Sequence, residues 1–170
     1  MRCVKVLRIR AEPLTGEAFA PFGRLIGRPR TEPHQESAAY AYWDKIIPLD
    51  LSGCPAELGF LEARHRPFAV SRLERHRKAT QTFIPFSTAA SVLVVAPGNP
   101  DDDHDRPRPE AVRAFLLDGT TGYHLFRGVW HLSPFPIGPV ARFVMVVRRD
   151  TIVDDQEIRD LGATVEVTLA

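Results

Sequence analysis

Short runs of apolar and β-branched residues recur along this chain, and prolines and glycines separate them. Runs rich in Val, Ile, Phe and Thr that are bounded by turn-forming residues indicate strands, and their short spacing is typical of a sandwich or a small barrel. The strands expected on this basis are Phe68–Arg75, Thr80–Ile84, Ser91–Ala96, Val112–Leu117, Tyr123–Phe126 and Val140–Arg148. The pattern therefore predicts an all-β barrel with minor helix.

Few segments have a helical pattern. Glu17–Phe22 is expected to form a short helix with Thr15 as its N-cap, and Glu110–Arg113 a single turn. Gly27–Tyr40 is polar and is expected to be a surface loop. The segment Pro97–Pro109 carries four aspartates, but it lacks the central glycine and terminal glutamate of a calcium-binding EF-hand loop. We therefore expect a solvated loop there.

Length and composition narrow the class of protein. With 170 residues, 44% of them hydrophobic and 25% charged, the chain matches one globular domain spanning residues 1–170. A net charge of +1 is small for a protein that binds nucleic acid. Cys3 and Cys54 are too few for a disulfide framework. The start, MRCVKVLRIRAEP, lacks the apolar stretch of a signal peptide, and no later run could span a bilayer, so we expect a cytoplasmic protein without membrane contact.

The stretch Arg64–Lys78 is basic, with Glu74 as its one acid. Read as a patch, it suggests a polyanion-binding surface. Read as a strand, it places Arg72, Glu74 and His76 on one face, beyond apolar residues on the same face. That second pattern is typical of a barrel wall that runs from a packed core to a polar mouth, where such folds bind ligands. The segment by itself leaves both readings open.

Two motifs resemble the cupin family. The string ERHRKATQTFIPF places Glu74, His76 and Gln81 where cupins have His, His and Glu, and FRGVWHLSPF aligns Gly128 and His131 with the cupin PxGxxH motif. The resemblance implies a cupin-like β-barrel, or double-stranded β-helix. It also implies that Glu74, His76, Gln81 and His131 could hold a divalent metal such as Ni²⁺, Zn²⁺ or Mn²⁺, with no organic cofactor.

Within the cupins, the chain resembles the ureidoglycolate lyase family. The resemblance rests on LERHRKATQTFIP at Leu73–Pro85, RAF at Arg113–Phe115, YHLFRGVWH at Tyr123–His131, APFGRLI at Ala20–Ile26 and YWDKI at Tyr42–Ile46, where Trp43 replaces a usual His. It implies a homodimeric enzyme that cleaves (S)-ureidoglycolate to glyoxylate and urea. Hydrolysis of the ureido group to ammonia and CO₂ is the alternative chemistry.

The reaction needs a general base, a general acid and a partner for the substrate carboxylate. We expect His76, His131 and Glu74 to be the catalytic or metal-binding groups, and Gln81 to bind the substrate through its amide. Arg72 is the first candidate to bind the carboxylate and Arg148 the second. Tyr123 and His124 are substrate-binding candidates of which only one should face the pocket, because strand residues alternate in direction. Trp130 should point away from His131, into the core or a dimer contact.

Two other functions fit the same residues. One is a different cupin enzyme that acts on a small organic acid. The other is a cupin that binds a small acid without turnover.

Overall fold

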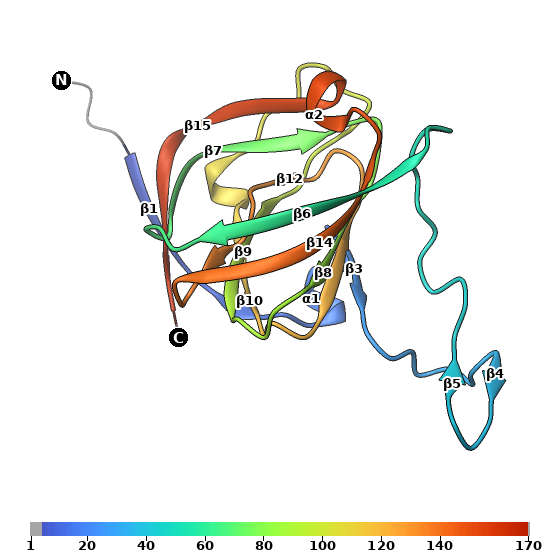
Figure 1. Cartoon of the computed structure of the whole chain (residues 1–170). Helices are drawn as coiled ribbons and strands as arrows, with labels where there is room; N and C mark the ends of the chain where they lie inside the picture. Colours follow the sequence, from blue (N-terminus) through green and yellow to red (C-terminus); the bar gives the residue numbers. More distant parts are fainter. Residues whose placement is uncertain (1–4, 170) are drawn as a thin grey trace.

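Two curled β-sheets form a half-barrel (Figure 1). The structure is a computed structural model that describes residues 5–169, so Cys3 lies outside the described part of the chain. The mainly-β, cupin-like fold expected from the sequence is confirmed. The first sheet has the strand order β1 (Lys5–Arg10), β15 (Gln156–Thr168), β7 (Ala69–His76), β12 (Trp130–His131), β9 (Ser91–Ala96), β10 (Arg113–Leu117) and β2 (Glu12–Pro13), with β13 (Phe135–Pro136) beside β9. The second has the order β3 (Gly23–Ile26), β11 (Gly122–Leu125), β8 (Gln81–Pro85), β14 (Val140–Arg148) and β6 (Ala56–Arg64), and β4 (Gln35–Glu36) pairs with β5 (Ala41–Tyr42) in a separate hairpin.

The predicted strands all exist. Ser91–Ala96 and Val140–Arg148 match β9 and β14 at both ends, and the others differ by one or two residues. The long strands β6 and β15 were not predicted, because charged residues interrupt their apolar positions and hide the strand pattern. The polar segment Gly27–Tyr40 contains β4 and part of the hairpin turn, and is therefore more regular than a plain loop.

Helical structure is confined to single turns. Helix α1 (Gly16–Phe19) begins at the predicted N-cap, where the Thr15 hydroxyl accepts a hydrogen bond from the Ala18 amide at 3.2 Å. The other turns are α2 (Thr151–Asp154) and a 3₁₀ turn at Pro109–Ala111. Within residues 5–169 no helix has the length and apolar character that crossing a bilayer requires.

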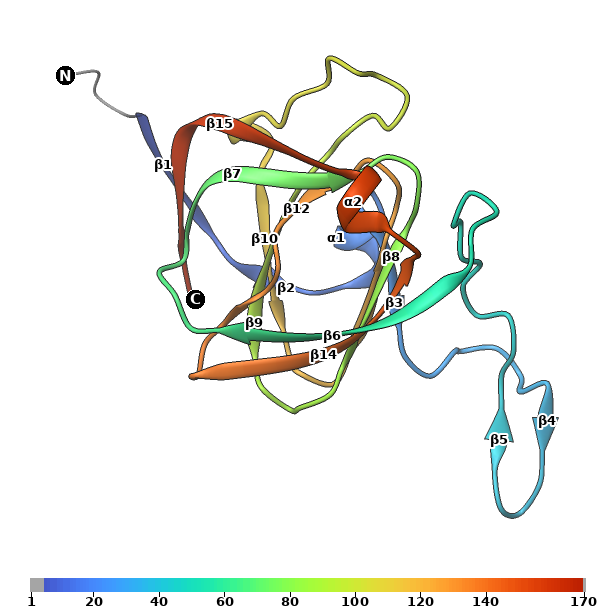
Figure 2. The ribbon, with the colours of Figure 1, turned by 45° about the horizontal axis from the view of Figure 1, so that its top comes forward.

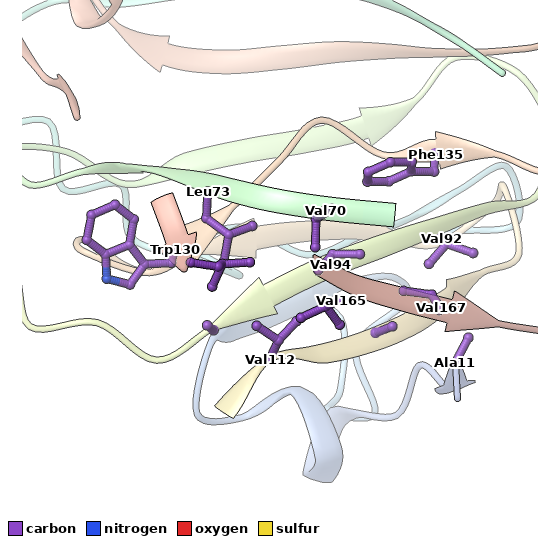
Figure 3. Close-up of a cluster of buried hydrophobic side chains, with 13 residues drawn as sticks. Ala11, Val70, Leu73, Val92, Val94, Val112, Trp130, Phe135, Val165 and Val167 are labelled. Carbon is purple, nitrogen blue, oxygen red and sulfur yellow. The ribbon is translucent and has the colours of Figure 1, made fainter. Parts of the chain in front are cut away.

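The chain buries apolar side chains on both faces of the first sheet. Along β9, Val92 and Val94 point to one side and Leu93 and Val95 to the other, and all four are buried. The side with Leu93 faces the second sheet and holds an aromatic cluster that includes Phe115. The opposite side holds a second cluster, which we call the outer cluster. Figure 3 shows it with Trp130 at one end and Phe135 at the other. A strand buried on both faces explains the continuous run SVLVVA.

Strand β15 covers this second cluster by bending. Its first residues pair with β7, and its last residues, Ala163–Thr168, pair in parallel with β1. The bend lies near Gly162, whose φ of +68° belongs to the left-handed region that glycine adopts without strain. Figure 2 shows β15 curving over the end of the half-barrel. The C-terminal segment is therefore part of the core, and one strand joins the core to the rim.

A single buried arginine ties the aspartate-rich loop to this sheet. The fully buried Arg75 guanidinium donates to Glu157 on β15 at 2.7 Å and to Asp105 at 3.0 Å, and it stacks over the Trp130 ring at 4.6 Å. It also donates to the backbone carbonyls of Asn99 and Asp102. The loop is solvated as expected, since residues 101–104 are exposed, but two of its carbonyls and Asp105 also bind the buried Arg75.

We expect the substitution Arg75→Met to lower the free energy of unfolding by about 3 kcal/mol, because it leaves the Asp105 carboxylate without its cation, Glu157 with Arg159 alone, and two loop carbonyls without their donor. Arg8→Met removes an exposed arginine that pairs with Glu166, and should cost at most about 1 kcal/mol. Urea denaturation followed by tryptophan fluorescence measures both values. Equal effects of the two substitutions would contradict the anchoring role of Arg75.

Candidate active site

Strand pairing brings the residues of the two motifs together. Strands β7 and β12 run antiparallel with Glu74 opposite His131, and β15 places Gln156 opposite His76. Because side chains alternate along a strand, Arg75 and Trp130 point into the outer cluster while Glu74, His76 and His131 point into the half-barrel. As predicted, Trp130 points away from His131 and is fully buried in the core.

Glu74, His76 and His131 form a compact cluster. One potential ligand atom from each lies within 4.8 Å of the others. The Nε2 atom of His131 is 3.9 Å from Oε1 of Glu74, and the rings of His76 and His131 are 5.4 Å apart between centroids. Gln81 on β8 reaches the same point from the second sheet, with Oε1 3.1 Å from Nε2 of His131. The four residues predicted as the site therefore meet in one place.

The hydrogen bonds of His131 determine which ring atom faces the site. Its Nδ1 lies 2.9 Å from the Val129 carbonyl oxygen, which can only accept, so Nδ1 carries a hydrogen. In the neutral ring Nε2 then presents a lone pair toward Gln81 and Glu74. This lone pair can accept a proton, or it can bind a cation together with the Gln81 oxygen. If the Gln81 amide is flipped, the lone pair accepts a hydrogen bond from its NH₂ group.

Burial keeps both imidazoles neutral. It lowers the pKa of His76 to about 3, with the neighbouring His131 adding to the effect and a backbone hydrogen bond at Asp155 opposing it. Burial also lowers the pKa of His131, against the opposing effects of Glu74 and the Val129 carbonyl. At neutral pH neither ring is protonated to an imidazolium that could act as an acid, and each offers one nitrogen lone pair.

Glu74 and His76 of the cluster, together with Gln81, line a cavity of about 290 Å³ between the edge of the second sheet and β7. Its polar lining includes Gln156, whose Nε2 donates to Oε2 of Glu74 at 2.5 Å, and Thr151, whose hydroxyl is 3.4 Å from Nδ1 of His76. Sequence reasoning missed both, because they come from α2 and β15, some 80 residues away, with no motif spacing to link them. The remaining wall is mostly apolar: Gly59, Phe60, Leu61, Phe83, Met145, Val147 and Ile152.

Gly128 has a structural role in the second motif. Its φ is +78°, and a Cβ there would lie 2.6 Å from the nitrogen of Pro100. Its amide donates to the His76 carbonyl at 2.7 Å. The glycine therefore lets the chain turn tightly between the aspartate-rich loop and β7, and this turn starts the strand that carries His131.

Tyr123 and His124 lie outside the cavity. Tyr123 is fully buried in the core, where it stacks on Phe83 at 4.7 Å between centroids, and its hydroxyl has no hydrogen-bond partner within residues 5–169. His124 points to the other face of the sheet, where its Nδ1 lies 2.8 Å from the Thr82 hydroxyl. It lines a separate hollow of about 320 Å³ with Arg24 and Arg127. The two residues alternate as predicted, but neither lines the cavity around the cluster.

The two arginines expected to bind a carboxylate are also placed elsewhere. Arg72 is exposed and is not among the residues that line the cavity. Arg148 is buried, and both its terminal nitrogens bind Asp154 at 2.7 Å. A guanidinium already paired in this way has no free face for a substrate carboxylate.

Three arginines of the basic stretch Arg64–Lys78 bind groups of the protein itself. Besides the buried Arg75, Arg66 donates to the Ser133 carbonyl at 2.6 Å and lies over the Phe135 ring. Arg77 donates to the Pro100 carbonyl and pairs with Asp103. These arginines bind groups of the protein itself, so the reading as a barrel wall is favoured over the polyanion patch.

The cluster can hold a divalent metal. Two neutral imidazoles, a carboxylate and an amide oxygen are donors that such ions accept. The other ring nitrogen of His131 donates a hydrogen bond to a backbone carbonyl, as histidines that bind metals usually do. The lone pairs of His131 Nε2 and Gln81 Oε1 converge at 3.1 Å, which suits a shared cation.

Comparison with known proteins shows which sequences this chain is similar to. A sequence model of the family described as ureidoglycolate lyase matches residues 6–168. The chain is 35% identical over 142 residues to the ureidoglycolate lyase of Burkholderia mallei (strain NCTC 10229), covering 81% of this chain and 80% of that protein. It is 34% identical over 143 residues to ureidoglycolate lyase 1 of Rhizobium meliloti (strain 1021), covering 81% of this chain and 80% of that protein.

We expect the buried His76 to make the protein less stable in acid. Its pKa of about 3 in the folded state is below the ordinary value near 6.5, so the unfolded chain binds the proton more strongly. The free energy of unfolding is then fully retained above pH 6.5 and falls by about 1.4 kcal/mol per pH unit as the pH drops from there toward 3.

Urea denaturation of EDTA-treated protein at pH 7 and pH 5 tests this. The wild type should lose about 2 kcal/mol more than His76→Gln between these values. His104→Gln, which removes an exposed imidazole, should keep the wild-type pH dependence. Identical losses for wild type and His76→Gln would contradict the effect assigned to His76.

Proposed function

The chain belongs to the ureidoglycolate lyase family, and from this premise we propose that it cleaves (S)-ureidoglycolate to glyoxylate and urea. The observation that carries the proposal is the convergence of Glu74, His76, Gln81 and His131 from two sheets at one point, where the first three line a cavity and His131 lies directly behind them. In this proposal residues 1–170 act as one cupin-like domain and the enzyme is a cytoplasmic homodimer. Sedimentation of the purified protein and cell fractionation test the last two points.

The reaction moves one proton and breaks one bond. The carbinol hydroxyl loses its proton, its oxygen forms the aldehyde C=O of glyoxylate, the C–N bond breaks, and the departing nitrogen of urea gains a proton. A single group that first accepts and then donates a proton can serve both ends of this sequence.

Glu74 is the group proposed for this proton transfer. It is the one carboxylate among the described residues that line the cavity. Gln156 holds one of its oxygens, and the other faces His131. Orientation by a neighbouring amide keeps the carboxylate within reach of a substrate bound between the two sheets.

The other polar groups bind and orient the substrate. The Gln81 amide binds the ureido group of the substrate. His76 and His131 present neutral imidazole nitrogens to the carbinol hydroxyl of the substrate or to a metal. Glu74, His76, Gln81 and His131 would hold a divalent ion such as Ni²⁺, Zn²⁺ or Mn²⁺. When bound, such an ion supplies Lewis-acid polarisation of the substrate oxygens. The apolar wall limits water near the reacting atoms.

Product analysis tests the activity directly. Purified protein is incubated with racemic ureidoglycolate, before and after EDTA treatment, and glyoxylate, urea and ammonia are measured against the spontaneous reaction. We expect equimolar glyoxylate and urea from one enantiomer, without ammonia. Ammonia in place of urea would show hydrolase chemistry, and no product above background, with Ni²⁺, Mn²⁺ or Zn²⁺ added back, would overturn the assignment. Activity lost with EDTA and restored by one of these ions would show that the cluster works with a metal.

We expect Glu74→Gln to lower kcat by about 10²- to 10⁴-fold, since the amide keeps the shape of the side chain but cannot accept the proton. Steady-state kinetics measure the change. Glu62→Gln, which alters an exposed carboxylate on β6, should retain wild-type kinetics. Full activity of Glu74→Gln would remove the proton-transfer role from this residue.

A further inference from the structure

The cavity and the proposed substrate do not match in charge. Ureidoglycolate carries a carboxylate and has no apolar group, whereas the described residues that line the cavity include no lysine or arginine. Glu74 is itself negative, so a second carboxylate beside it needs a cation nearby. A metal in the cluster would neutralise Glu74 first. The cavity of a single chain is therefore short of positive charge.

Exposed apolar side chains lie at the mouth of the cavity and on the adjoining outer face of the edge strand β6. Ile152 on α2 lines the cavity and is exposed by 75%, whereas the side chain of Phe60, exposed by 59%, lies on the outer face of β6 against Phe86. Their neighbours Leu58 and Val153 are exposed by 77% and 84%. We call these four residues the apolar rim. A small polar substrate does not contact so much apolar surface, and grouped exposed apolar residues usually mark an interaction site.

A long arm leaves the barrel between β3 and β6. Residues 27–50 contain the β4–β5 hairpin, and within residues 5–169 these two strands pair only with each other. Figures 1 and 2 both show the hairpin standing away from the two sheets. Tyr40, Tyr42, Ile46 and Leu49 are exposed along it. A two-stranded hairpin this short is marginal in water, so its apolar side chains need another surface to pack on.

The arm carries one arginine that forms no ion pair with the part of the chain that the structure describes. Arg30 is exposed, and no described carboxylate pairs with it. The other two arm cations are engaged within the arm: Arg28 lies 5.2 Å from the Trp43 ring and Lys45 lies 3.4 Å from Asp44. Arg30 is therefore the arm residue most available to a partner group.

The arm and the apolar rim lie on the same side of the molecule. The arm ends at Asp50, whose carbonyl accepts from the Thr80 amide, and β6 begins at Ala56, just before Leu58 of the rim. In Figure 1 the root of the arm and α2 lie at the same end of the half-barrel. A two-fold axis near this end would let each arm reach the other copy, because a symmetric dimer uses the same surfaces twice.

We propose that the arm of each copy closes the cavity of the other copy in a dimer, with its apolar side chains on the apolar rim and Arg30 toward the substrate carboxylate. This inference rests on the proposed function for its ligand. In this arrangement the exposed apolar side chains of the arm cover the apolar rim of the other copy. Arg30 supplies the positive charge that the cavity lacks. The complete site then consists of residues from two chains.

Mixed dimers test whether the site is shared. Arg30→Ala removes the arm cation and should lower kcat/KM about a hundred-fold, and Glu74→Gln leaves the arm intact but disables its own cavity. Each variant alone should be nearly inactive. After unfolding and refolding as a 1:1 mixture, about a quarter of the wild-type specific activity should return, because half of the dimers are mixed and each has one complete site. Arg10→Ala, an exposed change on β1 away from the arm, should keep wild-type activity.

Two results of this experiment would contradict a site shared between chains. Wild-type activity of Arg30→Ala, or a mixture as inactive as its two components, would overturn the shared site. Circular dichroism and thermal denaturation confirm that each variant is folded before it is mixed.

A second measurement does not depend on turnover. Tyr42 is replaced by the photo-crosslinking residue p-benzoylphenylalanine, and ¹⁵N-labelled and unlabelled chains are refolded together before irradiation. Mass spectrometry should find crosslinks between chains of different label, from position 42 to peptides that contain residues 56–64 or 151–154. Crosslinks within one chain only, or to another face, would overturn the docking of the arm. If the wild type does not cleave ureidoglycolate but these crosslinks form, the function fails while the docking stands.

Discussion

The stacking of one buried guanidinium on one indole fixes the orientation of the whole candidate site. Arg75 on β7 lies over Trp130 on β12, and its nitrogens bind β15 and the aspartate-rich loop. Glu74 and His76 flank Arg75 in the sequence, and His131 follows Trp130. Because neighbouring strand residues point to opposite faces, burying Arg75 and Trp130 in the outer cluster forces the three site residues into the half-barrel. A slip of one residue would exchange the core and the site.

The same placement sets the electrostatics of the site. Two imidazoles buried beside a carboxylate cannot both be charged without a large loss of hydration, so burial holds them neutral. Neutral nitrogens and one carboxylate suit a metal or a proton acceptor, but they do not attract an anionic substrate. Burial favours neutral imidazoles in this cavity, whereas binding of a carboxylate requires positive charge there. A cation brought from outside the cavity satisfies both requirements.

The open end of the half-barrel is where such a cation could enter from another copy of the chain. Strand β6 is the edge of the second sheet, and it leaves both the cavity and an apolar rim exposed beside it. Exposed edges and apolar patches of this kind are unfavourable in an isolated chain. The arm at residues 27–50 shows the complementary property, because its apolar side chains have no core of their own. Both features become reasonable if the functional unit contains two copies of the chain.

The sequence by itself determined the strand-rich fold, the N-cap at Thr15 and the two motifs, because these depend on local patterns of residue type and spacing. It also brought together Glu74, His76, Gln81 and His131, through the resemblance of those motifs to a family. Only the tertiary structure decided which strand faces are buried, so it placed Tyr123 in the core and His124 on the opposite face, and paired Arg148 with Asp154. It alone added Gln156 and Thr151, since strand pairing joins residues that no sequence spacing relates.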